Sequence, residues 1–258
     1  MPEWPDLQVL RARLATALAG RRIVSVTVGD PVVVRATRPP EELLVGRTLR
    51  AVRQRGKYLL FECDAETALV VNPMLSGLFA LAATGAPATR DTRLTLSLDD
   101  ARDLRYRDDT RMGKVYLLRG ERPEDAVPGF AALGPEPADL EGFADRARRR
   151  GGDVRNMLMD QRFVAGIGNA YADEILWAAR LHPKRPVRSL GGDELSRLED
   201  ALHVVLARAV DEVEAGTPPA LGTKVRAHLR VRGRAGEPCP RCGAPIRRTR
   251  KGDDETHY

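Results

Sequence analysis

The stretch that decides how the second half of this chain folds is DQRFVAGIGNAYA, residues 160–172. Its two glycines, Gly166 and Gly168, stand just before Asn169, a residue type that favours the N-cap of a helix. From Asn169 to Ala179, apolar residues recur at three- and four-residue spacing, which predicts a helix. Glycines here let the free N–H groups of a helix N-terminus approach a phosphate closely. The stretch therefore predicts a turn and helix suited to anion binding, although a turn that serves only packing would have the same pattern.

The helical pattern extends to both sides of this stretch, and a different pattern precedes it. Further helices are predicted at residues 139–149, 154–160 and 192–214. Residues 120–137 are rich in proline, glycine and acids, which predicts a linker. Before the linker, an amphipathic helix at 5–18 is followed by short β-branched or alternating runs at 23–28, 58–63, 68–71, 94–98 and 114–118. These runs predict a β-sandwich or barrel.

The predicted fold class is therefore α+β with several domains. A β-sandwich with a leading helix would occupy residues 1–119, the linker 120–137, a helical domain 138–220 and a basic tail 221–258.

The composition is that of a soluble globular chain, with 43% hydrophobic and 30% charged residues among 258. No apolar stretch has the character of a bilayer span and the first residues have no signal-peptide pattern, so we expect a cytoplasmic protein without a membrane partner. The net charge of +6 lies entirely in residues 221–258, which hold ten Lys and Arg against four acids. Such a block indicates binding to phosphate, of nucleic acid or of an anionic surface, and a merely solvated tail would have the same charge.

The chain begins Met1-Pro2-Glu3. Removal of Met1 would leave Pro2 as a secondary amine with an ordinary α-amino pKa of about 7.7–8.0, so it would be partly unprotonated at neutral pH. Attack of such an amine on an aldehyde-level carbon yields an iminium that stays cationic and acts as an electron sink, which favours elimination. Glu3 could move protons beside it. A helix start with proline near its first position has the same sequence.

Two more features could carry chemistry. Lys57 lies in the run QRGKY, residues 54–58, a turn and strand start that would place it at the mouth of the sandwich, where a lysine is usually only a solvated charge. Cys239 and Cys242 form a knuckle of the kind that ligates zinc, and a tetrahedral site needs a second pair of ligands. The third cysteine, Cys63, falls in a predicted strand, where we expect it to be buried.

The order and spacing of these motifs resemble those of the formamidopyrimidine-DNA glycosylase and endonuclease VIII family over nearly the whole chain. The motifs are MPE at 1–3, RGKY at 55–58, LGPEP at 133–137, the element at 165–171 and GRAGEPCPRCG at 233–243. The resemblance implies a base-excision repair DNA glycosylase that removes oxidised bases and, as an AP lyase, cleaves the strand by β,δ-elimination through a Schiff base on an N-terminal proline. It also implies a helix–two-turn–helix element in the helical domain and a zinc-finger-like β-hairpin in the tail.

Carried over residue by residue, the resemblance implies three catalytic residues. Pro2 would be the nucleophile that attacks C1′, Glu3 the acid/base that assists opening of the sugar ring, and Lys57 the holder of a phosphate near the lesion. The implied partner is double-stranded DNA with a damaged base or an abasic site, bound by a monomer at the nucleoid, with the damaged nucleotide flipped out of the duplex. The implied DNA-binding residues are Asn169, Gly168, Arg111, Leu75, Met112 and Arg234.

The wedge positions depart from the family pattern. Leu75, Thr110 and Met112 stand where the formamidopyrimidine branch has methionine, arginine and phenylalanine. Arg111 is adjacent to Thr110 and could substitute for the arginine. Leu75 and Met112 could equally be core residues.

The finger departs further. Cys239 and Cys242 would be metal ligands, but the second Cys-x-x-Cys that follows Thr-His-aromatic in the family is not present after Tyr258, and His257 would supply at best a third ligand. We expect either a truncated sequence, which we favour, or a protein that has lost its structural zinc. The family's arginine before Thr-His is also replaced, with Asp254 or Glu255 nearby. These departures leave open a damaged-DNA-binding protein of the same fold without catalysis.

Overall fold

The computed structural model describes residues 1–219, 221, 224–251 and 254–258, and the chain divides into two compact units. The N-terminal unit comprises Met1–Pro2, Asp6–Ala131 and Gly216–Lys224. The C-terminal unit comprises Glu3–Pro5, Ala132–Ala215 and Val225–Tyr258. The boundary at Ala131 falls inside the stretch predicted as a linker, and three residues at the start of the chain pack with the second unit.

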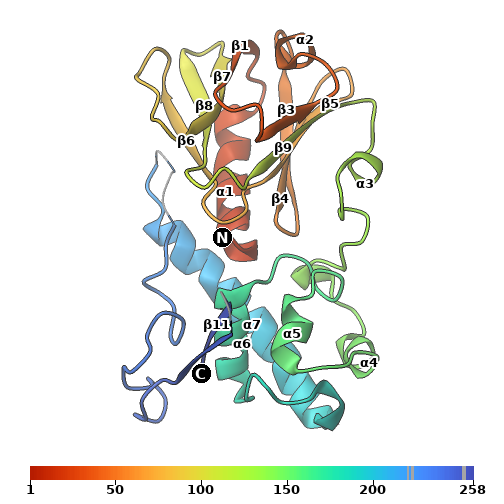
Figure 1. Cartoon of the computed structure of the whole chain (residues 1–258), viewed down its shortest axis with the longest axis vertical. Coiled ribbons are helices and arrows are strands. Elements are labelled where there is room, and N and C mark those ends of the chain that lie inside the picture. Colours follow the sequence, from red (N-terminus) through yellow and green to blue (C-terminus); the bar gives the residue numbers. More distant parts are fainter. Residues whose placement is uncertain (220, 222–223, 252–253) are drawn as a thin grey trace. The chain divides into compact units, whose positions relative to one another are not determined.

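The N-terminal unit is a sandwich of two sheets with α1 (Trp4–Leu18) beside them (Figure 1). One sheet has the strand order β1-β7-β8-β6 and the other β2-β9-β5-β4-β3, with only β2 and β9 parallel. The remaining elements are two short helices, α2 (Pro40–Leu44) and α3 (Pro123–Ala126). The strands are β1 (Ile23–Val28), β2 (Val34–Ala36), β3 (Leu49–Arg55), β4 (Tyr58–Cys63), β5 (Thr67–Asn72), β6 (Leu78–Ala83), β7 (Thr92–Leu98), β8 (Arg102–Arg107) and β9 (Lys114–Arg119).

Aromatic side chains join the two sheets in the core. The ring of Phe61 on β4 lies 5.3 Å from that of Phe79 on β6, which lies 5.2 Å from Tyr106 on β8. The helix α1 contributes Leu7 and Leu14, both fully buried in the same cluster. Each fully buried apolar side chain of this size contributes about 1.5–3 kcal/mol, so this core of both sheets and α1 is a large source of stability in the unit.

The C-terminal unit is helical and ends in a two-stranded hairpin (Figure 1). Its core forms around α6, whose residues from Ala170 to Leu176 are buried on all sides, as expected for a central helix. Its elements are η1 (Pro137–Asp139), α4 (Phe143–Arg148), α5 (Val154–Met159), α6 (Asn169–Ala179), η2 (Val187–Ser189), α7 (Gly192–Gly216), β10 (Arg248–Lys251) and β11 (Asp254–His257).

Two acidic residues of α6 hold the basic tail against the helix. The Glu174 carboxylate accepts hydrogen bonds from the backbone N–H groups of Arg230, Val231 and Arg232 at 2.8–2.9 Å. The Asp173 carboxylate accepts from the backbone N–H of His257 at 3.0 Å and from the Arg232 guanidinium at 3.0 Å. Both side chains are at most 2% exposed, so the tail forms part of the folded unit rather than a solvated extension.

The predicted fold class is confirmed, with differences in detail. The strands β1 and β4 and the helix α6 have the predicted bounds. The strand β8 was not predicted because its sequence, RDLRYR, has only two apolar residues. Leu104 and Tyr106 face the core, whereas Asp103 and Arg105, on the opposite face, are also buried and bond each other at 2.8 Å. The helix predicted at 139–149 is wrong in its first half, because Gly142 adopts a left-handed conformation (φ 63°) and α4 starts only after it.

Candidate active site and nucleic-acid interface

The Glu3 carboxylate lies at the N-terminus of α6. Its Oε2 accepts hydrogen bonds from the backbone N–H groups of Gly168 at 2.7 Å and Tyr171 at 3.2 Å, and its Oε1 accepts from Ala170 at 2.9 Å. The side chain is 3% exposed. The first N–H groups of a helix lack partners within the helix and carry its positive end, so a buried carboxylate is stabilised there. The residue that follows Pro2 is thereby fixed in place.

The turn before α6 is shaped to receive the start of the chain. Gly166 has φ 94°, and a Cβ at this position would lie 2.8 Å from Cβ of Trp4, so only glycine fits. The carbonyl of Gly166 accepts a hydrogen bond from the Trp4 backbone N–H at 3.0 Å. Gln161 closes the turn from inside, because its amide bonds Gly166 N at 2.9 Å and Ile167 O at 2.7 Å. Gly166 thus gives Trp4 the space to pack against the turn.

The prediction that Asn169 caps α6 is wrong. Gly168 occupies the N-cap position with extended φ and ψ, Asn169 is the first helical residue, and no side-chain cap bond is made there. The Glu3 carboxylate binds the N–H groups that a cap would have bound. The Asn169 side-chain oxygen instead accepts from the Arg155 guanidinium at 3.0 Å, and Arg155 also bonds Asp173 at 2.9 Å. Asn169 therefore belongs to a polar network with two residues that the sequence did not single out.

Pro2 and Lys57 both belong to the N-terminal unit, and both are more buried than a terminal residue and a turn lysine usually are. Pro2 is buried. Lys57 is 9% exposed and lies, with Gly56, in the two-residue turn between β3 and β4. Gly56 has φ 55°, and its carbonyl accepts from the Gln54 side chain at 2.9 Å. A turn lysine is usually only a solvated charge, but Lys57 is largely enclosed.

The wedge residues lie on two loops that the Asp108 carboxylate joins. Asp108 is fully buried and accepts from the Ser76 hydroxyl, from the backbone N–H of Gly113 at 2.7 Å and from the Thr110 hydroxyl at 2.9 Å. Burial raises the pKa of Asp108, but these hydrogen bonds together outweigh it and hold the pKa below its ordinary value. The loop of residues 72–77 and that of 108–113 are therefore tied to one ionised carboxylate.

Two apolar side chains on these loops are exposed, and the neighbouring arginine is held in an ion pair. Leu75 is 47% exposed and Met112 is 41% exposed, so neither is a core residue. The Arg111 guanidinium bonds the buried Asp30 carboxylate at 2.5 and 3.2 Å, and this contact lowers the pKa of Asp30. Thr110 shares a 2.7 Å hydrogen bond with Ser76. Because Arg111 is held by Asp30, the structure argues against Arg111 as a substitute for the family's wedge arginine.

The cysteine knuckle is attached to α6 through Trp177. The Trp177 indole N–H donates to Sγ of Cys239 at 3.4 Å, and this bond lowers the pKa of Cys239 to about 7. The Arg241 guanidinium lies over the Trp177 ring, 4.2 Å from its centre. Cys242 is exposed. Within the described ranges, no three side chains of His, Cys, Asp or Glu come together in a way that could hold a metal ion, so the described ligands do not complete a tetrahedral zinc site.

Several tail arginines that the charge count assigned to phosphate have partners inside the protein. Arg234 pairs with Glu237 at 2.8 Å, Arg232 with Asp173 at 3.0 Å, and Arg248 with Glu255 at 3.3 Å. The sequence could not reveal these pairs, because two of the three join residues on different segments. The charge available for phosphate is therefore smaller than the composition indicates. In the described part of the chain, no helix has both the length and the apolar character needed to cross a bilayer.

Three family models match the chain in order. They are the formamidopyrimidine-DNA glycosylase N-terminal domain over residues 1–115, the H2TH domain of the same protein over 133–218, and a zinc finger found in FPG and IleRS over 236–258. The formamidopyrimidine-DNA glycosylase of Moorella thermoacetica is 37% identical, over 97% of this chain and 95% of the relative. That of Geobacter sulfurreducens is also 37% identical, over 100% and 98%.

Solved structures agree with this result. The Fpg of Lactococcus lactis, in a complex with DNA that contains an abasic site, matches with a TM-score of 0.88 at 30% identity and covers 99% of this chain and 97% of its own. The MutM (Fpg) protein of Thermus thermophilus matches with a TM-score of 0.87 at 34% identity, over 100% and 97%. The chain therefore belongs to the formamidopyrimidine-DNA glycosylase family of base-excision repair enzymes.

Proposed function

We propose that this protein excises an oxidised base from double-stranded DNA and cleaves the strand at the resulting abasic site, with Pro2 as the nucleophile. The observation that carries the proposal is the position of Glu3, whose carboxylate is fixed by three backbone N–H groups directly after the reacting residue. The family membership makes the protein a DNA glycosylase, and AP-lyase activity is typical of that family. The DNA in related complexes contains an abasic site or a damaged base.

The chemistry follows from the secondary amine. After removal of Met1, the Pro2 nitrogen attacks C1′, the bond from C1′ to the base breaks, and the base leaves with a proton. The N–H proton of Pro2 leaves with the base, and the sugar ring then opens: the C1′–O4′ bond breaks, Glu3 donates a proton to O4′, and the Pro2 nitrogen forms the iminium with C1′. The iminium withdraws electrons from C2′, whose proton is lost while the bond from C3′ to the 3′ phosphate breaks; a second elimination releases the 5′ phosphate. Glu3 is the group that gives and takes the proton on the sugar-ring oxygen. Its fixed position reduces the reorganisation that this transfer needs.

The surrounding residues would position the substrate. Lys57 holds a phosphate next to the lesion. Glu3 already accepts from the backbone N–H groups of Gly168, Ala170 and Tyr171, so Asn169 binds the DNA backbone through its side-chain amide N–H, oriented by the hydrogen bond from Arg155 to its oxygen. Leu75 and Met112 fill the space that the flipped nucleotide leaves, because both are exposed apolar side chains on loops tied to Asp108. Since Arg111 is bound to Asp30, we propose that recognition of the opposite base is weak and depends on the short Thr110 side chain.

The finger segment would contact the duplex as part of the C-terminal unit. Arg234 contacts a phosphate from the exposed end of its ion pair with Glu237. Cys239 and Cys242 supply two thiolates for the zinc that proteins with this finger bind. The described residues do not complete the ligand set, so no step of the reaction is assigned to zinc. We expect the protein to work as a monomer in the cytoplasm, at the nucleoid.

Borohydride trapping tests the nucleophile. The full chain is incubated with an abasic duplex and sodium borohydride, which reduces the iminium to a stable amine and leaves a covalent protein–DNA complex. We expect the wild-type protein to form this complex and Pro2→Gly to lose it. Lys57→Gln keeps the nucleophile, so it should still be trapped, at a higher protein concentration. Circular dichroism of each variant shows whether it is folded.

Two outcomes would contradict the proposal. Trapping of Pro2→Gly at the wild-type level, with the DNA attached to a residue other than residue 2 in the peptide map, would place the nucleophile elsewhere. A folded wild-type protein that binds the abasic duplex but is never trapped on it would favour a non-catalytic damaged-DNA-binding protein of this fold.

A further inference from the structure

Trp4, the residue that follows Glu3, is attached to the C-terminal unit at several points. Its indole Nε1–H donates a hydrogen bond to Oε2 of Glu136 at 2.8 Å. Its backbone N–H is the first of α1 and has no partner within that helix, and it donates to the Gly166 carbonyl at 3.0 Å. The side chain packs against the apolar core of the unit, and its Cβ would lie only 2.8 Å from a Cβ on Gly166. The proposed reaction gives no role to this residue.

The segment that carries Glu136 is itself held against the turn before α6. The Ala165 N–H donates to the Pro135 carbonyl at 2.9 Å. A Cβ on Gly134 would lie 2.5 Å from a carbonyl oxygen of the turn, so only glycine permits this close approach. These residues belong to the LGPEP motif at 133–137, to which the proposed reaction assigns no step. The motif therefore provides a fixed acceptor for the indole.

The anchored residues define the backbone next to the reacting amine. The peptide group between Glu3 and Trp4 is planar and is held at its N–H by the Gly166 carbonyl. The Glu3 side chain is held as well, by the first N–H groups of α6. Between Cα of Glu3 and the Pro2 nitrogen, only two bonds can then rotate: N–Cα of Glu3 and Cα–C of Pro2. The position of Trp4 is thus transmitted to the nucleophile over a short, stiff path.

We propose that Trp4 is a positioning residue for Pro2. Through Glu136 and Gly166, it holds the start of the chain so that the amine stays close to the orientation in which it attacks C1′, and less entropy is then lost in the reaction. Trp4 needs no contact with DNA for this role and acts only through the chain. The inference rests on the proposed function, because it takes Pro2 as the nucleophile.

Single-turnover trapping tests the role of the indole. The rate constant for the covalent complex is measured with the full chain in excess over an abasic duplex in the presence of borohydride, and fluorescence anisotropy gives Kd for the same duplex. Trp4→Phe keeps an aromatic ring but loses the N–H. Its rate constant should fall about tenfold, because a misplacement of 1 Å can cost about 100-fold, whereas its Kd should not change. The control Val205→Ala removes packing from the same core on α7, so it should lower Tm and keep the wild-type rate constant.

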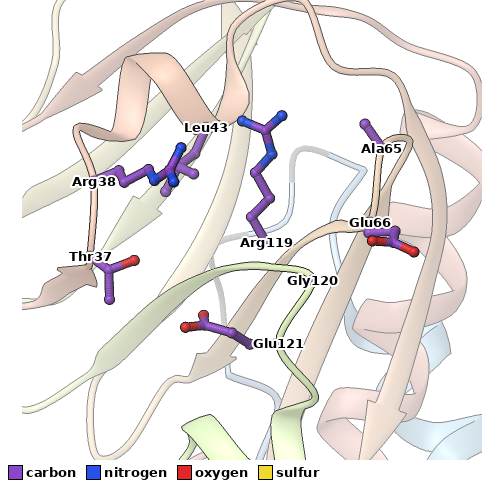
Figure 2. Close-up of a pocket in the computed structure, with 8 residues that line it drawn as sticks. All are labelled: Thr37, Arg38, Leu43, Ala65, Glu66, Arg119, Gly120 and Glu121. Carbon is purple, nitrogen blue, oxygen red and sulfur yellow. The ribbon is translucent and has the colours of Figure 1, made fainter.

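A double-mutant cycle tests whether the indole acts through Glu136. In a Glu136→Ala background, Trp4→Phe should lower the rate constant by less than about threefold, because the hydrogen bond is already absent. The matched control is Glu121→Ala, which removes an exposed carboxylate from the wall of a pocket of about 680 Å³ on the N-terminal unit (Figure 2). In that background, Trp4→Phe should keep its full effect of about tenfold.

The hydrogen bond can also be observed directly by NMR. The chain has two tryptophans, so the nitrogen–proton correlation spectrum should contain two indole N–H signals, and the one lost in Trp4→Phe belongs to Trp4. This signal should shift, and its exchange with solvent should become faster, in Glu136→Ala but not in Glu121→Ala.

Several results would overturn the proposal. They are a wild-type rate constant in Trp4→Phe, an equal loss in Val205→Ala, an undiminished effect of Trp4→Phe in the Glu136→Ala background, and an indole signal that Glu136→Ala leaves unchanged. A wild-type protein that is never trapped would overturn the proposed function together with this inference. A wild-type protein that is trapped at the same rate as Trp4→Phe would overturn this inference alone.

Discussion

Replacement of Asp108 by asparagine should destabilise the N-terminal unit by about 3 kcal/mol. The substitution keeps the shape but removes the charge, and each charge-assisted hydrogen bond then loses roughly 1 kcal/mol. The asparagine amide nitrogen is a donor, so the Gly113 N–H, now 2.7 Å from Oδ2, would face another donor in a fully buried site. An unpaired buried N–H costs about 1–3 kcal/mol. Because the two terms both count the Gly113 bond and are not additive, we take about 3 kcal/mol, the low end of their combined range.

Thermal unfolding is the assay, with Asp109→Asn as the matched control. Asp109 is the exposed neighbour of Asp108, so its substitution removes the same charge without a buried contact. For a chain of this size, about 3 kcal/mol corresponds to a decrease in Tm of about 6–12 °C. The Tm of Asp109→Asn should stay within about 2 °C of the wild type, since surface substitutions seldom exceed 0.5 kcal/mol. Equal Tm values for the two variants would refute the reasoning.

The pH dependence supplies a second check on Asp108. Its folded-state pKa lies below the ordinary value of about 3.9. The carboxylate therefore contributes its full stability above about pH 4, and that contribution is lost as the pH falls through the folded-state pKa. The stability difference between the wild type and Asp108→Asn should accordingly narrow below pH 4. A difference that stays constant down to pH 2.5 would contradict this explanation.

A positioning role for Asp108 predicts an effect that lost stability alone would not produce. If it holds the loops of Leu75 and Met112 for insertion into the duplex, Asp108→Asn should slow single-turnover base excision from a fully paired duplex, at a temperature where the variant is folded. Excision of the same lesion from an unpaired bubble should change much less, because the base is already unstacked there. Equal slowing on both substrates would leave Asp108 as a purely structural residue.

Three further predictions concern other contacts. Glu3→Gln should lower the free energy of unfolding by about 2 kcal/mol and speed amide hydrogen exchange at the start of α6, because the helix N-terminus loses its buried carboxylate; protection at these amides as in the wild type would contradict this. Gly113→Ala should prevent normal folding, since the added Cβ would lie 1.9 Å from a buried tyrosine hydroxyl. The control Gly191→Ala should be tolerated, because a Cβ there would have no heavy atom within 4 Å. Circular dichroism of the two variants measures the difference. Cys63 should react with iodoacetamide at least 100-fold more slowly than the exposed Cys242, because burial raises its pKa to about 12, and mass spectrometry of timed samples measures the ratio.

The local elements were predictable because their signals lie in neighbouring residues. The helix from Asn169 to Ala179 has its spacing of apolar residues within eleven positions, and β4 has its alternation within six. Strands such as β3 and β8 escaped because their charged residues disguise the alternation. In β8 the buried charges are tolerated because Asp103 and Arg105 pair with each other and with the segment after β6: Arg105 donates to the carbonyls of residues 86 and 87, and Asp103 accepts from the hydroxyl of Thr84. These further partners lie 18 or 19 residues away, so the pattern of the strand itself cannot indicate them.

The candidate site divides in the same way. Pro2, Glu3, Lys57 and the cysteine pair could be selected from residue type and order, because an N-terminal secondary amine or a Cys-x-x-Cys has its chemistry wherever it lies. Asp108 could not be selected, since an aspartate before Asp-Thr-Arg is an ordinary turn residue until its three neighbours converge on it. The role of Arg111 also changed, because Asp30 lies 81 residues away in the sequence.

By itself, the sequence determined the family, the order of the domains and the chemical groups available at the N-terminus, because all of these are properties of residue type and spacing. Only the tertiary structure decided which partners those groups have. It placed the Glu3 carboxylate on an amide 165 residues away, removed Asn169 from the cap position, and paired the tail arginines with acids of the same unit. The physical reason is that hydrogen bonds and ion pairs form between atoms that folding brings within about 3 Å, and distance along the chain does not limit them.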